Sequence, residues 1–214
     1  ALKNAGFDPQ EVAKLEEITE LTLVSGAFTM PQWEDLKNLM PKCKNLTAIT
    51  IKKEVGLEAM PTVEPVFAAP KCTTVTIEAK LDIMADKAFS GAKELTTVRL
   101  LATKELKDGV FGDCKKLTTV EMPLLQQLGS GVFLNCTALA TVQLPASLKT
   151  IPKATFMGCS ALTSVPNATT IEEVEDSAFE GCTALTQLVC PNLKEVGANA
   201  FKGCTGVTKL ELGL

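Results

Sequence analysis

The chain has 214 residues, a formal net charge of −4 and a hydrophobic fraction of 46%. Its acidic and basic residues are interspersed, which argues against a nucleic-acid-binding surface, and no apolar run approaches the roughly 18 residues of a membrane span. The sequence contains no histidine, so it lacks the commonest general base near neutral pH and the commonest zinc ligand, and we expect no enzyme, no metal site and no cofactor.

The N-terminal residues are expected to form a helical cap. Asp8, Pro9 and Glu11 stand where a helix N-cap, a first helical residue and a reciprocal capping carboxylate belong. A similar start at residues 29–32 precedes Trp33 and further apolar residues at helical spacing, which predicts a helix over residues 31–40 with Trp33 as a core anchor. Residues 52–66 carry two prolines and predict a longer loop or a bulging rung.

A repeating unit fills the rest of the chain. Its regular copies begin with a phenylalanine, have aliphatic residues six and nine positions later, and follow one another at intervals of 22 or 23 residues. The phenylalanines are Phe89, Phe111, Phe133, Phe156, Phe179 and Phe201. Less regular copies, including one headed by Phe67, extend the pattern backwards to a total of nine rungs. A fixed period of this size is typical of a solenoid, so we predict one domain over residues 1–214, with irregular first rungs in 1–45 and regular repeats in 46–214.

Each repeat predicts two extended segments and one tight corner. Apolar and polar residues alternate about Val98, Val120 and Val142, which is typical of a strand with one buried face. A second, shorter pair of apolar residues follows in each regular repeat and predicts a second wall. These pairs are Leu125 and Leu128, Leu148 and Ile151, Ile171 and Val174, and Leu193 and Val196. The segment from phenylalanine to cysteine then forms the corner that leads to the next strand.

The repeat resembles a known family. The segments LATVQLPASLKTIPKATFMGC and LTQLVCPNLKEVGANAFKGC share a leucine, a strand, a proline, an apolar pair and phenylalanine with cysteine three residues later. This is similar to the BspA-like leucine-rich repeats of bacterial surface proteins, from about Leu46 onwards. The resemblance implies an α/β leucine-rich-repeat solenoid of mainly short parallel strands with little helix, and extracellular or cell-surface display with a role in adhesion. Ala92 in the cysteine column and Asn167 in an aliphatic column depart from the pattern.

Eight cysteines leave three interpretations open. Six share one column of the repeat, while Cys72 and Cys190 fall in aliphatic columns. Buried small apolar side chains are the leading interpretation. Disulfides between neighbouring rungs are the second, although parallel side chains in one column fit the required S–S dihedral poorly. Metal binding or catalysis is the third, and it lacks both a histidine and a C-x-x-C pair.

The outward positions of the predicted strands form the candidate partner-binding surface. They flank the inward valine or leucine of each rung, on the face that solenoids commonly use for recognition. The candidates are Thr74, Thr76, Thr97, Arg99, Thr119, Glu121, Thr141, Gln143, Ser164, Gln187, Lys209 and Glu211. The alternative is that threonine is simply a good exposed strand residue.

Two functions remain open on this evidence. One is a non-enzymatic surface module that binds a protein or glycan on a host or neighbouring cell through the concave strand face. The other is a stalk or spacer with no ligand of its own. Joint replacement of Arg99, Glu121 and Gln143 is expected to abolish binding in the first case and to change nothing in the second. The final strand, at residues 210–214, leaves an open edge that predicts either a further segment or self-association.

Overall fold

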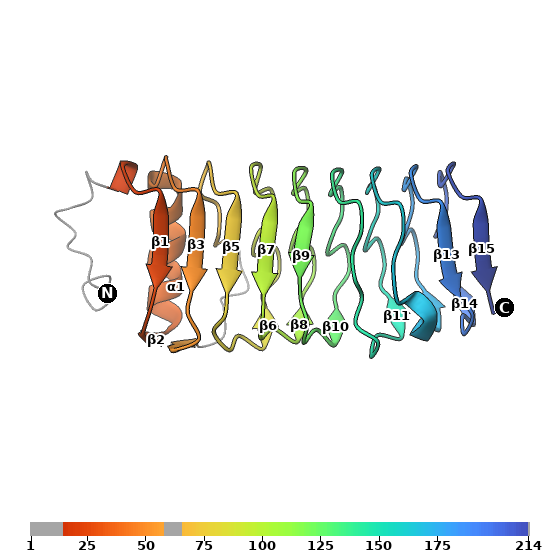
Figure 1. Cartoon of the computed structure of the whole chain (residues 1–214), viewed down its shortest axis with the longest axis horizontal. Helices are drawn as coiled ribbons and strands as arrows, with labels where there is room; N and C mark the ends of the chain where they lie inside the picture. Colours follow the sequence, from red (N-terminus) through yellow and green to blue (C-terminus); the bar gives the residue numbers. More distant parts are fainter. Residues whose placement is uncertain (1–14, 58–65, 214) are drawn as a thin grey trace.

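The chain winds into turns that stack side by side along a rod, with β1 at one end and β15 at the other (Figure 1). The computed structural model describes residues 15–57 and 66–213. Within them, the regular turns have a first wall, a second wall and a corner, as the repeat predicts, although two turns lack a strand in the first wall. The helix predicted at Asp8 and Pro9 lies outside the described residues.

The first wall is a parallel ladder of strands from successive turns. Its larger sheet has the order β1-β3-β5-β7-β9. The strands are β1 (Glu20–Leu23), β3 (Ala48–Ile51), β5 (Thr74–Ile77), β7 (Thr97–Leu100) and β9 (Thr119–Glu121), and a second pair is β13 (Gln187–Cys190) with β15 (Lys209–Leu212). Equivalent residues pair in register, as Val75 does with Val98 and Val98 with Val120. The inward side chain of Val98 is fully buried, so the predicted alternation about it is confirmed.

The second wall consists of short strands at the predicted apolar pairs. Two three-stranded parallel sheets contain β6 (Ile83–Met84), β8 (Glu105–Leu106) and β10 (Gln127–Leu128), then β11 (Thr150–Ile151), β12 (Glu173–Val174) and β14 (Glu195–Val196). Near the N-terminus, β2 (Gly26–Phe28) pairs with β4 (Val55–Leu57). Within the segment predicted as a longer loop or a bulging rung, Val55 turns inward and extends the second wall, while residues 58–65 lie outside the described residues.

One α-helix is present in the described part of the chain. It is α1 (Met30–Leu39), which lies behind β1 and β3 in Figure 1 and continues into the short 3₁₀ helix η3 (Met40–Lys42). Thr29 donates its backbone N–H to Oε1 of Gln32, at 3.0 Å, which confirms the predicted capping box. Trp33 is fully buried as expected. A second 3₁₀ helix, η4, covers Ala168–Thr170.

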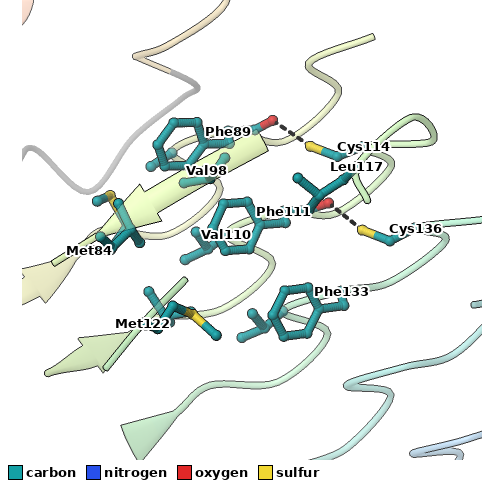
Figure 2. Close-up of a cluster of buried hydrophobic side chains, with 14 of the residues drawn as sticks. Met84, Phe89, Val98, Val110, Phe111, Cys114, Leu117, Met122, Phe133 and Cys136 are labelled. Carbon is teal, nitrogen blue, oxygen red and sulfur yellow. Dashed lines mark hydrogen bonds between the residues drawn. The ribbon is translucent and has the colours of Figure 1, made fainter. Parts of the chain in front are cut away.

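An aromatic column runs through the core. The rings from Phe67 to Phe201 stack on one another with centroid separations of 4.6 to 5.5 Å. Trp33 contacts the ring of Phe67 edge-on at 6.3 Å and so ends the column towards the N-terminus. Figure 2 shows three rings of this column, those of Phe89, Phe111 and Phe133, one above another. The aromatic column predicted from the repeat is confirmed.

The corners rely on left-handed backbone on both sides of each phenylalanine. In six consecutive turns, the residues two before and two after the phenylalanine have φ between 54° and 78°. They are Lys87 and Gly91, Gly109 and Asp113, Gly131 and Asn135, Ala154 and Gly158, Ser177 and Gly181, and Asn199 and Gly203. Glycine, asparagine and aspartate tolerate this conformation best, which explains their frequency there.

The first wall is interrupted between β9 and β13. The predicted strand about Val142 does not form, and only an isolated bridge joins Thr141 to Ser164. In earlier turns, the residue after the strand donates its N–H to the preceding turn, as Glu78 does to Ile51 and Leu101 to Ile77. Proline occupies this position in later turns, at Pro123 and Pro145, and Pro166 stands within the next strand position. Because proline has no N–H, each one removes a ladder bond.

Candidate functional site: the outward face of the strands

The structure places all twelve candidate residues on the outward side of the first wall, which we call the strand face. They form two columns, because Thr74, Thr97 and Thr119 occupy successive paired positions and Thr76, Arg99 and Glu121 do the same. All twelve are exposed or half-buried. The columns are continuous from β5 to β9 and again from β13 to β15, while Thr141, Gln143 and Ser164 lie in the interrupted part.

The charged residues of the strand face are paired with one another. Arg99 Nη2 lies 3.0 Å from Glu121 Oε1 on the next strand, with the two side chains 50% and 43% exposed. Lys209 Nζ lies 2.9 Å from Glu211 Oε1. The guanidinium of Arg99, one of the candidate residues, is thus already engaged within the face. A partner would meet a polar surface without local net charge at these pairs.

A separate threonine column holds the turns together and was not predicted. At the start of the first wall, a threonine hydroxyl donates to a backbone carbonyl of the preceding turn at 3.0 to 3.2 Å in most turns. The donors are Thr47, Thr73, Thr96, Thr118, Thr163, Thr186 and Thr208. The repeated Leu-Thr dipeptide is the sequence signal for this role. The repeat is therefore rich in threonine for two reasons. One set of threonines bonds to the preceding turn, and the other lies on the outward strand face.

Grooves occur where the first wall is interrupted. One, with a volume of about 570 Å³, lies between the end of β9 and the following turn. Its lining is formed by Val120, Glu121, Met122, Pro123, Gln143, Leu144, Pro145, Ala146 and Asn167. A second, of about 240 Å³, lies between the turn of Ser164 and β13, and it shares Asn167 with the first. Neither groove was predicted, although the prolines of these turns were the available signal.

The cysteine thiols belong to the core. All eight are free, and seven are buried while Cys204 is half-buried. In five of the six turns that contribute to the shared column, from Cys114 to Cys204, the thiol donates to the phenylalanine carbonyl of the preceding turn, as Cys136 Sγ does to Phe111 O at 3.1 Å (Figure 2). Burial raises the pKa of the Cys114 and Cys159 thiols to about 12. The leading interpretation, buried small side chains, is confirmed, and the hydrogen bond adds a role that the sequence did not reveal.

No group of three or more His, Cys, Asp or Glu residues in the described part of the chain is arranged to hold a metal ion. Over the same residues, no helix has the length and hydrophobicity needed to cross a membrane.

The repeat matches a family pattern over most of the chain. Residues 37–123 and 84–208 match the family described as "BspA type Leucine rich repeat region", in six copies. The chain belongs to the BspA-type leucine-rich-repeat family. This confirms the resemblance and the α/β leucine-rich-repeat solenoid expected from it. Leucine-rich-repeat proteins are generally non-enzymatic scaffolds that present a surface for binding.

Two solved structures of bacterial leucine-rich proteins are similar to this chain in fold. A leucine-rich cell surface protein from Faecalibacterium prausnitzii A2-165 is 25% identical with a TM-score of 0.66, over 78% of this chain and 47% of that protein. The chain thus spans about half the length of that relative. A leucine-rich repeat protein from T. pallidum is 27% identical with a TM-score of 0.63, over 75% of this chain and 77% of that one. No curated protein matches the chain.

Proposed function

We propose that this chain is a secreted or surface-displayed binding module that engages a protein or glycan on a host or neighbouring cell through the strand face. The observation that supports the proposal is the continuity of that face. Five paired strands present the same two outward positions from each successive turn, and the side chains there are accessible and, apart from Ala48, polar. The description of the F. prausnitzii relative as a cell surface protein supports the location.

A spacer is the second candidate, and a specific observation favours it. The aromatic column is unbroken from Phe67 to Phe201, and the ion pair of Arg99 with Glu121 satisfies both charges inside the face. A continuous stack and an internally paired surface are the features expected of a rod that holds another domain away from the cell.

Binding to immobilised extracellular-matrix proteins, mucin glycans and whole cells distinguishes the two functions. We expect saturable binding by the wild-type chain and a loss of at least tenfold in affinity when Thr76, Thr97 and Arg99 are all replaced by alanine, because Thr76 pairs with Arg99 across β5 and β7 and Thr97 is the neighbouring outward residue of β7. We use this variant in place of the joint replacement of Arg99, Glu121 and Gln143, because Glu121 and Gln143 also line the larger groove.

The matched control is the triple alanine variant of Glu105, Gln127 and Thr150, which lie on short strands of the second wall. It is expected to bind like the wild type. Equal binding by both triple variants would reject the strand face as the binding surface, and the absence of binding across the whole panel would favour the spacer. Thermal unfolding of each variant checks that the fold is retained.

A further inference from the structure

Lysines from four successive turns gather along one edge of the rod. They lie at the corners, in the short segments that lead into β3, β5, β7 and β9, and all of them are exposed. We call this set the lysine strip, and its members are Lys42, Lys44, Lys71, Lys93, Lys115 and Lys116. Residues as far apart in the sequence as 42 and 116 are thereby brought into one line.

Contacts between neighbouring turns show that these segments lie side by side. Lys71 Nζ donates to Asn45 Oδ1 at 2.9 Å, and Lys116 Nζ lies 2.6 Å from Glu94 Oε2. Each contact joins equivalent positions of adjacent turns, directly before the first buried residue of the wall segment. Because parallel strands repeat at about 4.8 Å, the strip extends for roughly 15 Å along the rod.

The fold itself does not require lysine at these corners. Lys44 N and Lys115 N each donate to the carbonyl two residues earlier, at 3.0 and 2.9 Å, and the last four turns make the same bond at 2.9 Å. The equivalent residue pairs in those turns carry no charge, and they are residues 137–138, 160–161, 183–184 and 205–206. The same corner is therefore built with and without lysine, so folding does not explain the strip.

The positive charge of the strip is only partly neutralised within the chain. Lys44 Nζ lies 2.6 Å from Glu16 Oε1, and Lys116 is paired with Glu94. Among the described residues, no carboxylate forms an ion pair with the other lysines of the strip, which are Lys42, Lys71, Lys93 and Lys115. Exposed ion pairs contribute little free energy, so the two paired lysines can exchange a carboxylate for another anion.

We propose that the lysine strip binds a linear anionic glycan, whose sulfate or carboxylate groups pair with successive lysines along the rod. The glycan chain runs parallel to the rod axis, and the neighbouring threonines of the strand face offer hydroxyl groups to its sugar rings. The inference rests on the proposed function in that it specifies the class of glycan. It goes beyond that function by adding a charged contact surface beside the strand face.

A glycan suits the strip better than a nucleic acid or a membrane does. Single-stranded nucleic acids stack their bases on aromatic side chains, but the chain has no tyrosine, and Trp33 and the stacked phenylalanines belong to the core. A membrane-binding surface combines lysines with large apolar side chains that enter the lipid. Threonines, such as Thr96 and Thr118, lie beside the lysine strip instead.

Binding of a heparin dodecasaccharide tests the proposal, and the unsulfated heparosan dodecasaccharide is the comparison. We expect saturable binding of heparin in 50 mM NaCl that weakens at 150 and 300 mM NaCl, because salt screens exposed charges. Joint replacement of Lys71, Lys93, Lys115 and Lys116 by glutamine is expected to weaken the binding by about tenfold or more, since these charges act on the ligand together. Heparosan is expected to bind more weakly than heparin.

The matched control makes the same change in net charge elsewhere on the rod. It replaces four other exposed lysines by glutamine, and they are Lys149, Lys153, Lys194 and Lys202. This variant is expected to bind heparin like the wild type, and thermal unfolding verifies that both variants fold. An equal loss in the two variants would show that affinity follows the overall charge and would overturn the proposal.

Lysine acetylation followed by mass spectrometry gives a second measurement, made on the wild-type chain. Heparin is expected to protect Lys93 and Lys115 from acetylation and to leave Lys149 and Lys194 unchanged. The proposal is overturned if heparin does not bind in 50 mM NaCl, if heparosan binds as tightly, or if Lys93 and Lys115 gain no protection. Equally tight binding of single-stranded DNA or of phosphatidylserine vesicles would overturn it as well, because the strip would then not select a glycan.

The outcome is separable from that of the strand-face test. Heparin binding that survives in the triple variant of Thr76, Thr97 and Arg99 would support the lysine strip even when the panel yields no other partner. Conversely, a partner that depends on β5 and β7, in a chain that does not bind heparin, would support the strand face and reject the strip.

Discussion

At the scale of single residues, the hydrogen bonds of the cysteine column could not be predicted from the repeat. Its period places the thiols in the interior, but it carries no information on hydrogen bonding. The phenylalanine carbonyl accepts the N–H of the cysteine in its own turn, as Phe111 O does from Cys114 N at 3.1 Å, and also the thiol of the cysteine in the next turn. Cysteine is small, apolar and still able to donate a weak hydrogen bond, which suits this position.

The raised thiol pKa predicts a loss of stability at alkaline pH. Burial raises the pKa of Cys136 well above its ordinary value of 9.0, so above pH 9 the unfolded chain releases a proton that the folded chain retains. Stability is therefore complete below pH 9 and falls as the pH rises towards the pKa of the folded state. Above pH 9, the free energy of unfolding of the wild type therefore falls as the pH rises. Replacing Cys136 by serine is expected to make this fall less steep, by about 1.4 kcal/mol per pH unit.

Urea unfolding under reducing conditions from pH 7.5 to pH 10.5 measures this slope. Ser160→Ala is the control, because the Ser160 side chain is exposed and does not titrate in this range. A slope that is the same in wild type and Cys136→Ser would contradict the assignment of Cys136 as a thiol that stays protonated in the folded state.

The corner at Ala154 predicts a stabilising substitution. Ala154 has φ of 54°, whereas Gly109 and Gly131 occupy the equivalent position in the two preceding turns. A side chain with a Cβ costs roughly 1–2 kcal/mol in this region, partly offset by the greater freedom of glycine in the unfolded chain. Ala154→Gly is expected to raise the free energy of unfolding by about 1 kcal/mol in chemical denaturation. Ala140→Gly, which lies outside the left-handed positions, should lower it instead.

At the scale of elements, hydrophobic alternation predicted most of the strands and local backbone chemistry explains the failures. The pattern about Val98 and Val120 forms β7 and β9, and the predicted second-wall pairs form β10, β11, β12 and β14. The similar alternation about Val142 forms no strand, because Pro145 cannot donate to the preceding turn and Pro166, within the next strand position, cannot donate to this one. The strand β4 forms inside the segment whose two prolines suggested a longer loop or a bulging rung.

The aromatic column is the element whose disruption should cost most. Phe133 is fully buried and stacks on Phe111 at 5.4 Å and on Phe156 at 5.5 Å. Phe133→Ala is expected to lower the free energy of unfolding by about 3–5 kcal/mol, because adjoining turns cannot collapse into the cavity without losing register. Phe133→Leu is the milder comparison, with a smaller expected loss. A loss below about 1 kcal/mol for the alanine variant in chemical denaturation would show that the turns do close in.

At the scale of the whole molecule, the period was sufficient to predict the solenoid, and the family match confirms it. The candidate surface was predictable only in its location. Register places Thr97 and Arg99 on one face, but the pairing of Arg99 with Glu121 depends on side-chain conformations that a repeat pattern does not specify. The grooves were unpredictable for a related reason, since they arise from missing bonds between turns and not from the residues of any one turn.

The interruption after β9 also divides the rod mechanically. On one side lie the five-stranded sheet and the sheet of β6, β8 and β10, and on the other lie β11 to β15. The corner bonds, the stacked rings and the thiol of Cys136 connect the two blocks. Under tension along the axis, this boundary is weak, because among the described residues no backbone hydrogen bond joins the walls of the two turns. A pulled chain would then lengthen in two steps, parting at this boundary before either block unravels.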